Sequence, residues 1–172
     1  VDVPEMNYTN TGNNSGEVCT KGVVNTIGYY KNPGETKKVL VGEWLHTGDI
    51  GRWNSDGTLS IIDRKKNIFK LSQGEYVAAE RIENVLTKSK FISQLWCYGN
   101  SFLPMLVCVV TPEFTELEPY AKAKGWHVAD KVALVARAEA KVLIMDEIER
   151  EAKEGKLKSF EVPKAVHLEG HI

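Results

Sequence analysis

The hydrophobic pattern of the chain changes once, in the stretch from Ile62 to Asn67, and this change constrains the fold more than any other feature. Before it, short alternating segments are separated by Gly, Asn and Pro, which is typical of strands and turns. After it, strand-like apolar runs alternate with runs of helical spacing. We therefore predict an α/β or α+β chain, with a mainly β part followed by a mixed part of about 110 residues.

The first part contains three recognisable elements. The segment "GEVCTKG" predicts a short strand, and a short helix is expected from about Glu35. In "EWLHTGDIGRWNSDGTLSIID", Asp56-Gly57 lies between two alternating runs, which is a strong hairpin signal. We expect two short strands there, with Thr47-Gly48-Asp49 forming a turn after a strand.

The mixed part has its own expected order of elements. A strand at "NIFKLS" precedes a turn at Gly74 and a helix from Ala78 to Leu86. Two further strands, "SQLWCYGN" and "PMLVCVVTP", are expected next, the second central in a sheet because it is almost entirely apolar. They are followed by a helix in "PEFTELEPYAKAKG", a long helix from about Ala129 to Glu154 that stops at Gly155, and a strand in "VPKAVHLE".

Composition narrows the range of functions. The chain has 22 basic and 23 acidic residues and a net charge of -1, so no overall field attracts nucleic acid or an anionic membrane. It has no apolar run long enough to span a bilayer and no signal-peptide pattern, and a soluble protein is expected. Neither a disulfide nor a metal site is expected, because the spacing of the Cys and His residues suits neither: Cys19, Cys97, Cys108, His46, His127, His167 and His171.

A basic cluster coincides with the change of pattern, since Arg64, Lys65, Lys66 and Lys70 fall within seven residues. Such charges either keep an edge strand solvated and unpaired or bind a phosphate-bearing ligand. A nucleic-acid surface built with Phe69 and Tyr76 is a further alternative, but the run is short and acidic residues flank it. A steep salt dependence of binding would distinguish that alternative.

The expected long helix offers another alternative function. Its apolar stripe could bind a partner protein, which would make the chain an interaction domain. The stripe consists of Val132, Val135, Val142, Met145 and Ala152. Such stripes usually pack on the protein's own sheet, and we favour that interpretation unless the helix is exposed.

Several segments together resemble the adenylate-forming ligases, and within them the long-chain acyl-CoA synthetases of eukaryotes. They are "GEVCTKG", "GYYKNPGET", "WLHTGDIG", "DGTLSIIDRKKNIFKLSQGEYVAAERIE" and "VPKAVHLEG", which occur in the family's order and cover nearly the whole chain. The segment "DRKKNIFKLSQGEY" is specific, because other branches usually differ there. The resemblance implies a fatty acid–CoA ligase that uses ATP with Mg²⁺ to form an acyl-adenylate, and then transfers the acyl group to coenzyme A.

The resemblance also implies the domain organisation. Residues 1–62 would end the large AMP-binding domain, residues 63–66 would be a hinge, and residues 67–172 would form most of the small mobile domain. Lys66 matches the hinge position of the family. Rotation of the small domain would separate the two half-reactions.

Three residues are candidates for nucleotide binding. A carboxylate at Asp49 could accept hydrogen bonds from the two hydroxyls of a ribose, as the matching aspartate does in the family, although it could also cap its own turn. Arg64 has a permanently charged, forked guanidinium that suits ribose or phosphate oxygens. Thr47 could contact the adenylate phosphate or stabilise the turn. Lys65 is expected to be solvated.

Two residues are candidates for the second half-reaction. Related ligases have a lysine near the position of Lys70 that can reach the phosphate or the CoA side in one domain orientation. Gly74 lets the backbone turn tightly and approach a ligand, and this loop borders the pantetheine channel in the family.

The chain also departs from a whole synthetase. The phosphate-binding loop, the magnesium ligand, the fatty acid tunnel and the adenylating lysine of the family have no counterpart in it, so it is expected to be an incomplete part, inactive alone and without a catalytic residue. The resemblance implies an intracellular location, in the cytosol or on the cytosolic face of the endoplasmic reticulum or peroxisome, and it is compatible with peripheral membrane association of the full protein.

Overall fold

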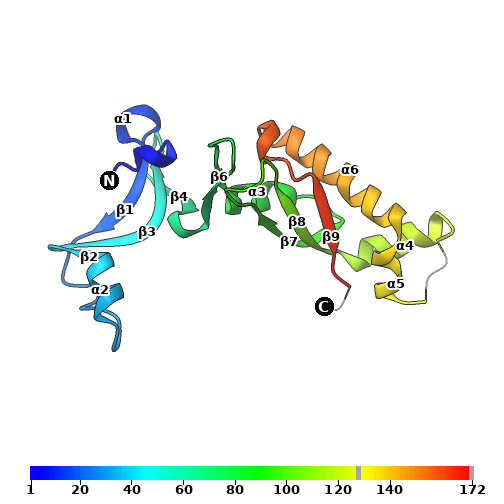
Figure 1. Cartoon of the computed structure of the whole chain (residues 1–172), viewed down its shortest axis with the longest axis horizontal. Coiled ribbons are helices and arrows are strands. Elements are labelled where there is room, and N and C mark those ends of the chain that lie inside the picture. The colour runs from blue at the N-terminus through cyan, green and yellow to red at the C-terminus, as the bar shows by residue number, and fades with distance from the viewer. Residues whose placement is uncertain (127–128, 171–172) are drawn as a thin grey trace. The chain divides into compact units, whose positions relative to one another are not determined.

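The computed structural model describes residues 1–126 and 129–170 (Figure 1). It divides into two compact units, Val1–Ile68 and Phe69–Ile172. His127 and His171, two of the histidines considered above, lie outside the described residues. The mixed composition of helices and strands confirms the predicted α/β class.

The first unit is built on one antiparallel sheet. Its strands are β1 (Ser15–Thr20), β2 (Leu40–Val41), β3 (Trp44–Trp53) and β4 (Leu59–Arg64), and β3 pairs with all three others. The predicted hairpin is confirmed, because β3 and β4 are joined through a turn in which Gly57 has φ of +82°. The shorter elements are η1 (Pro4–Met6), α1 (Asn10–Asn13), α2 (Pro33–Val39) and η2 (Lys65–Asn67).

Two expectations for this unit need correction. The short helix begins at Pro33 rather than Glu35, because Asn32 accepts a hydrogen bond from the Glu35 amide and acts as its N-cap. The predicted turn at Thr47-Gly48-Asp49 is wrong, since these residues lie inside the ten-residue strand β3. Gly48 has φ of +77° there, so the glycine provides a local irregularity within a continuous strand.

The second unit combines a hairpin with a three-stranded sheet. The hairpin pairs β5 (Ile68–Lys70) with β6 (Tyr76–Ala78). The sheet has the order β7 (Ile92–Tyr98), β8 (Val107–Pro112), β9 (Ala165–Leu168), with β7 antiparallel and β9 parallel to β8. The central position predicted for "PMLVCVVTP" is therefore confirmed.

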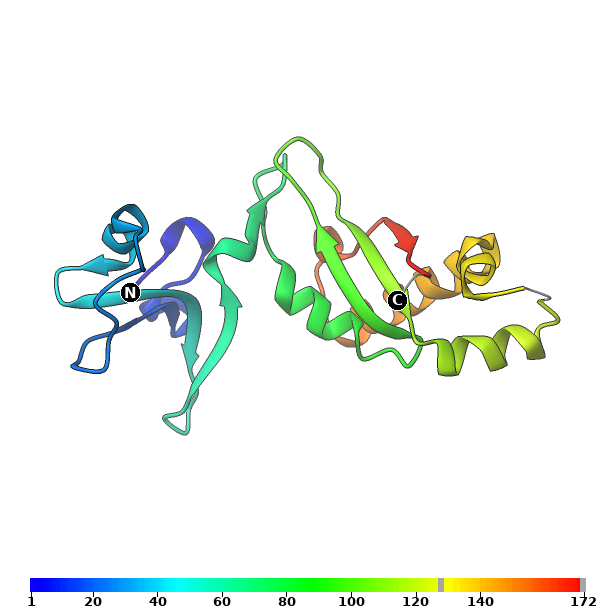
Figure 2. The ribbon, with the colours of Figure 1, turned by 90° about the horizontal axis from the view of Figure 1, so that it is seen from below.

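Four helices of the described residues accompany this sheet, and the first and the last of them pack against its strands. They are α3 (Ala79–Leu86), α4 (Phe114–Ala123), α5 (Lys131–Ala136) and α6 (Ala138–Glu154), with the short η3 (Ser159–Glu161) before β9. In Figure 2 the green strands β7 and β8 lie in front of the orange α6. The buried side of the sheet, including Cys97, Cys108 and Val110, joins one core with α3 and α6.

The single long helix predicted from Ala129 to Glu154 is wrong. The chain leaves helical geometry at Arg137, where ψ is 140°, and this residue separates α5 from α6. The stop at Gly155 is confirmed. Helix α6 packs on the unit's own core as preferred, but mainly through Ala140, Ile144 and Ile148, which are fully buried. Of the stripe expected from the sequence, Val135 and Ala152 are buried, whereas Val132 and Val142 are exposed.

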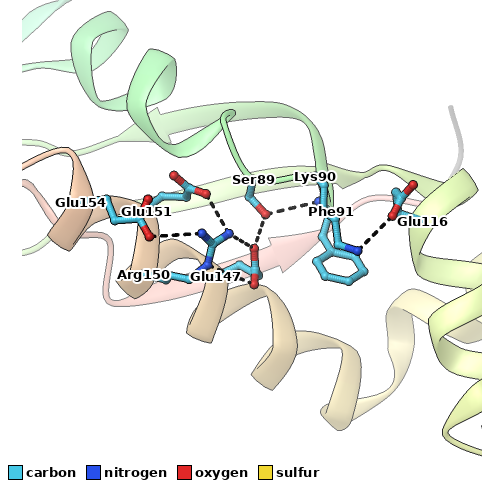
Figure 3. A network of polar contacts seen from close by, with 8 residues as sticks. All are labelled: Ser89, Lys90, Phe91, Glu116, Glu147, Arg150, Glu151 and Glu154. Carbon is cyan, nitrogen blue, oxygen red and sulfur yellow. Dashed lines mark hydrogen bonds and ion pairs between the residues drawn. The ribbon is translucent and has the colours of Figure 1, made fainter.

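A polar network fastens the turn after α3 to α6 (Figure 3). The Ser89 hydroxyl donates to a Glu147 carboxylate oxygen at 2.5 Å. The Arg150 guanidinium pairs with Glu147 at 2.6 Å and with Glu151 at 2.8 Å. Because Glu151 is buried, this pairing is needed to compensate its lost hydration.

Candidate functional site

The two charged candidates for nucleotide binding lie directly opposite each other. Asp49 of β3 and Arg64 of β4 are cross-strand partners, so their side chains share one face of the sheet. Arg64 Nε donates a hydrogen bond to Asp49 Oδ1 at 3.1 Å. The structure thus brings together two residues that are 15 positions apart in the sequence.

Both side chains remain accessible. The Arg64 side chain is 59% exposed and that of Asp49 is 32% exposed. Only Nε of the guanidinium faces the carboxylate, and the terminal amino groups have no hydrogen-bond partner among the described residues. A planar fork of this kind is suited to the oxygens of a phosphate or ribose.

Thr47 supports Asp49 from within the strand. Its hydroxyl donates to the Val18 carbonyl at 2.8 Å and accepts a hydrogen bond from the Asp49 backbone amide at 3.1 Å. The structure therefore assigns the Thr47 hydroxyl a positioning contact, since its single proton is used within the sheet. A contact of this hydroxyl with the adenylate phosphate remains a prediction.

Lys65 and Lys66 lie in the short helix η2, which follows β4 directly. Lys66 is exposed. The expectation that Lys65 is merely solvated is wrong, because its ammonium nitrogen lies 3.5 Å from a carboxylate oxygen of the buried residue Glu17. A buried carboxylate loses its hydration and attracts a nearby cation.

Lys70 and Gly74 belong to the hairpin of the second unit. Lys70 is exposed and its ammonium lies 5.3 Å from the centre of the Tyr76 ring, which is a cation–π distance. Gly74 has φ of +95°, and its amide donates to the Leu71 carbonyl at 2.9 Å. The turn predicted at Gly74 is confirmed, and its backbone conformation is one that favours glycine.

Glu17, Cys19 and His46 form a cluster that was not predicted from the sequence. One ligand atom from each residue lies within 4.8 Å of the others. Burial disfavours ionisation of Glu17, but the hydrogen bond with His46 and the charge of Lys65 outweigh it, and the pKa of Glu17 is lowered. Burial and the neighbouring Glu17 raise the pKa of the Cys19 thiol. A Glu-x-Cys spacing on a strand was a usable signal, but only the sheet brings His46 to it.

A cavity in the first unit is separate from the candidate nucleotide residues. It has a volume of about 640 Å³ and is bordered by residues of β1 and β3 together with Val41 and Leu59. Thr47, Asp49 and Arg64 are not among the described residues that line it. We base the candidate site on the paired charges, because they provide recognition chemistry that an open cavity by itself does not.

Comparison with known proteins gives the family. No protein-family model matches the chain. It is 48% identical over 168 residues to long chain acyl-CoA synthetase 5 of Arabidopsis thaliana, covering 97% of this chain and 25% of that protein. Fatty acyl-CoA synthetase B of Dictyostelium discoideum is 44% identical over 169 residues, with 98% and 25% covered. The chain is a homologue of the long-chain acyl-CoA synthetases. It spans about a quarter of the length of these acyl-CoA synthetases.

Solved structures agree with this homology to the acyl-CoA synthetases. The adenylation domain of a carboxylate reductase from Mycobacterium chelonae matches with a TM-score of 0.78 and 35% identity, over 98% of this chain and 25% of that chain. The A domain of carboxylic acid reductase from Segniliparus rugosus, solved with AMP and a co-purified carboxylic acid, matches with a TM-score of 0.80 and 32% identity, over 100% and 26%. The predicted resemblance to adenylate-forming enzymes is confirmed.

Proposed function

We propose that the chain is part of an ATP-dependent long-chain fatty acid–CoA ligase, which forms an acyl-adenylate and then the acyl-CoA thioester. The observation that carries this proposal is 44–48% identity to long-chain acyl-CoA synthetases across nearly the whole chain. The substrates would be a long-chain fatty acid, ATP and coenzyme A. The chain alone would be inactive, because the groups that stabilise charge at the reacting phosphate have no counterpart in it.

Within this ligase, Asp49 and Arg64 would bind the nucleotide. The carboxylate would accept hydrogen bonds from the ribose hydroxyls, and the terminal amino groups of Arg64 would donate to ribose or phosphate oxygens. The ion pair between them supports the proposal, because it holds both side chains on one face of the sheet before the nucleotide arrives. Binding would then cost little side-chain ordering.

Lys66, Lys70 and Gly74 would serve the change between half-reactions. Lys66 would lie in the hinge, and its place in η2, next to the division of the chain after Ile68, supports that role. Lys70 would approach the phosphate or the CoA. The loop around Gly74 would border the pantetheine channel, and the lack of a side chain there would leave room for the thiol arm.

The residues present do not fit a magnesium site. Mg²⁺ prefers a near-octahedral shell of oxygen ligands. Asp49 is already paired with Arg64, and the cluster of potential metal ligands among the described residues mixes one carboxylate with a thiol and an imidazole. We therefore assign no step of the reaction to a magnesium ion held by this chain.

A chimeric enzyme tests the proposal. Residues 1–172 would replace the matching quarter of long chain acyl-CoA synthetase 5 of Arabidopsis thaliana. We expect the chimera to release pyrophosphate from ATP and a long-chain fatty acid and to form acyl-CoA. A correctly folded chimera without either activity would contradict the proposed function.

Asp49→Asn in the chimera tests the nucleotide site. A hydrogen bond to a charged group contributes about 1.5–3 kcal/mol, so we expect ATP affinity and both half-reactions to fall by about tenfold or more. Asp56→Asn is the matched control, because Asp56 lies in the β3–β4 turn and accepts hydrogen bonds from Thr58. Equal effects of the two variants would remove Asp49 from the nucleotide site.

A second candidate function is another adenylate-forming ligase. The identity of 32–35% to carboxylic acid reductase domains favours adenylation in either case. The acceptor distinguishes the two candidates, because only an acyl-CoA synthetase passes the acyl group to CoA. Adenylation without thioester formation in the chimera would favour the second candidate.

The proposed location is intracellular, in the cytosol or on the cytosolic face of the endoplasmic reticulum or peroxisome. One relative, long chain acyl-CoA synthetase 6 of Arabidopsis thaliana, is named as peroxisomal and is 46% identical over 171 residues. No helix among the described residues has the length and apolar composition required to cross a bilayer. Membrane association of the whole ligase would therefore be peripheral as far as this chain contributes to it.

A further inference from the structure

Three potential metal ligands converge on one point of the first sheet. Glu17 and Cys19 are two residues apart on β1, and Cys19 lies opposite His46 of β3. His46 Nδ1 lies 3.0 Å from Glu17 Oε2 and 3.5 Å from Cys19 Sγ. Neighbouring strands hold all three side chains, so the geometry is set by the sheet.

The irregularity at Gly48 creates this arrangement. Glu17 pairs with Ile50 and Cys19 pairs with His46, so the register of β3 shifts by two residues between them. Gly48, with φ of +77°, lies between His46 and Ile50, where the register changes. Without the shift, a residue other than His46 would face Cys19.

The two distances to His46 Nδ1 are close to those between neighbouring ligands of a tetrahedral metal site. Zinc binds nitrogen and oxygen at about 2.0–2.2 Å and sulfur at about 2.3 Å, which places neighbouring ligand atoms of a tetrahedron about 3.3–3.6 Å apart. The nitrogen–sulfur distance of 3.5 Å lies in this range, and the nitrogen–oxygen distance of 3.0 Å is slightly shorter. A small outward movement of the carboxylate would admit the ion.

The same geometry excludes a catalytic relay. A Cys–His–Glu triad needs the thiol on one ring nitrogen and the carboxylate on the other. Here both groups face the single atom Nδ1 of His46. Ligands of a common ion must instead lie close to one another, and the three ligand atoms here lie within 4.8 Å of one another.

We propose that Glu17, Cys19 and His46 bind one zinc ion. A mixed set of one thiolate, one imidazole and one carboxylate suits this borderline-soft ion better than Mg²⁺ or Ca²⁺. The ion would join β1 to β3, while its fourth position would be taken by water. This proposal is independent of the ligase function.

Binding changes the charges around the site. The Cys19 thiol releases its proton to solvent and coordinates as a thiolate, and His46 coordinates as the neutral imidazole. The ammonium of Lys65, 3.5 Å from Glu17 Oε2 without the ion, competes with zinc for the carboxylate. Replacing this lysine should therefore strengthen binding.

Metal titration of the chimeric ligase, in which the first unit is part of a full-length protein, tests the proposal, and the Cys19→Ser chimera serves as the blank. Zn²⁺ binding would be measured by calorimetry, and Co²⁺ would be added as a spectroscopic probe whose near-ultraviolet charge-transfer band reports a thiolate ligand. We expect one equivalent of either ion above the blank and a band that zinc abolishes. We also expect Lys65→Met to tighten zinc binding several-fold.

Variants identify the ligands. Cys19→Ser and His46→Gln should each weaken zinc binding by tenfold or more, whereas Cys97→Ser and His167→Gln, on the separate sheet of the second unit, should bind zinc normally. Cys19→His should keep zinc but lose the thiolate band, which separates loss of a ligand from loss of the fold. An absent thiolate band in the unmodified chimera, or zinc binding that Cys19→Ser leaves unchanged, would overturn the proposal.

Discussion

At the scale of single residues, Gly99 shows how tightly the second unit is packed. A Cβ atom there would lie 2.5 Å from Phe69 Cε2 and 2.7 Å from Leu106 Cδ2. Leu106 is fully buried, so its side chain has little space into which it could move.

We predict that Gly99→Ala lowers the free energy of unfolding by about 1–3 kcal/mol through overpacking. Urea unfolding followed by circular dichroism would measure the change. Gly22→Ala is the control, because Gly22 has nothing within 4 Å of the added carbon, and its effect should stay within about 0.5 kcal/mol. Equal effects at the two sites would show that the crowding around Gly99 relaxes at no cost.

At the scale of elements, the polar network between α3 and α6 makes stability depend on pH. Burial opposes ionisation of Glu147, but hydrogen bonds from Arg150 and Ser89 and the charge of Arg150 outweigh it, and the pKa of Glu147 is lowered from its ordinary value of 4.5. A carboxyl with a lowered pKa stabilises the fold when it is ionised. This contribution is complete above the ordinary pKa and is lost as the pH falls through the lower, folded value.

We predict that Glu147→Gln reduces stability at neutral pH and flattens the loss of stability on acidification below about pH 4.5. Thermal unfolding across that pH range would measure both effects. Glu154→Gln is the matched control, because Glu154 meets the same arginine at 3.4 Å but has a side chain that is 64% exposed. If Glu147→Gln has the same acid profile as the unmodified chain, the network does not cause the pH dependence.

At the scale of the whole molecule, the two compact units differ in their cores. Among the described residues, the buried hydrophobic side chains of residues 1–68 are only Val3 and Ile50, whereas the second unit has one large continuous cluster. A unit that buries so little apolar surface cannot offset the loss of chain entropy on folding.

We predict that a chain of residues 69–172 folds cooperatively on its own and that a chain of residues 1–68 does not. Nuclear magnetic resonance spectra would show well-dispersed amide signals for residues 69–172 and poorly dispersed signals for residues 1–68. A cooperative thermal transition in residues 1–68 would contradict this prediction.

Lys66 provides a second prediction at this scale. Proline fixes φ near about -65° and restricts the preceding residue, so Lys66→Pro should stiffen the proposed hinge. In the chimeric ligase we expect pyrophosphate release to survive and thioester formation to fail. The control is Lys37→Ala, on the exposed face of α2. Lys156→Pro is unsuitable as a control, because Lys156 has φ of +53°, which proline cannot adopt. Equal loss of both half-reactions would place the hinge elsewhere.

The class of the chain, most of its strands and its resemblance to the long-chain acyl-CoA synthetases could be predicted from the sequence alone. Turn signals such as Asp56-Gly57 and the apolar run of β8 are local properties, so they could be interpreted without knowledge of distant contacts. The long helix was predicted wrongly because the apolar spacing continues across Arg137, while the backbone there leaves the helix.

The contacts between side chains, by contrast, could not be predicted without the tertiary structure. Asp49 and Arg64 were each chosen as ligands of a nucleotide, but their mutual ion pair depends on the register of β3 and β4. The same holds for Glu17, Cys19 and His46, because a shift of two residues in strand pairing selects the histidine that faces the thiol. Such registers depend on hydrogen bonds between segments far apart in the chain, and spacing within one segment carries no information about them.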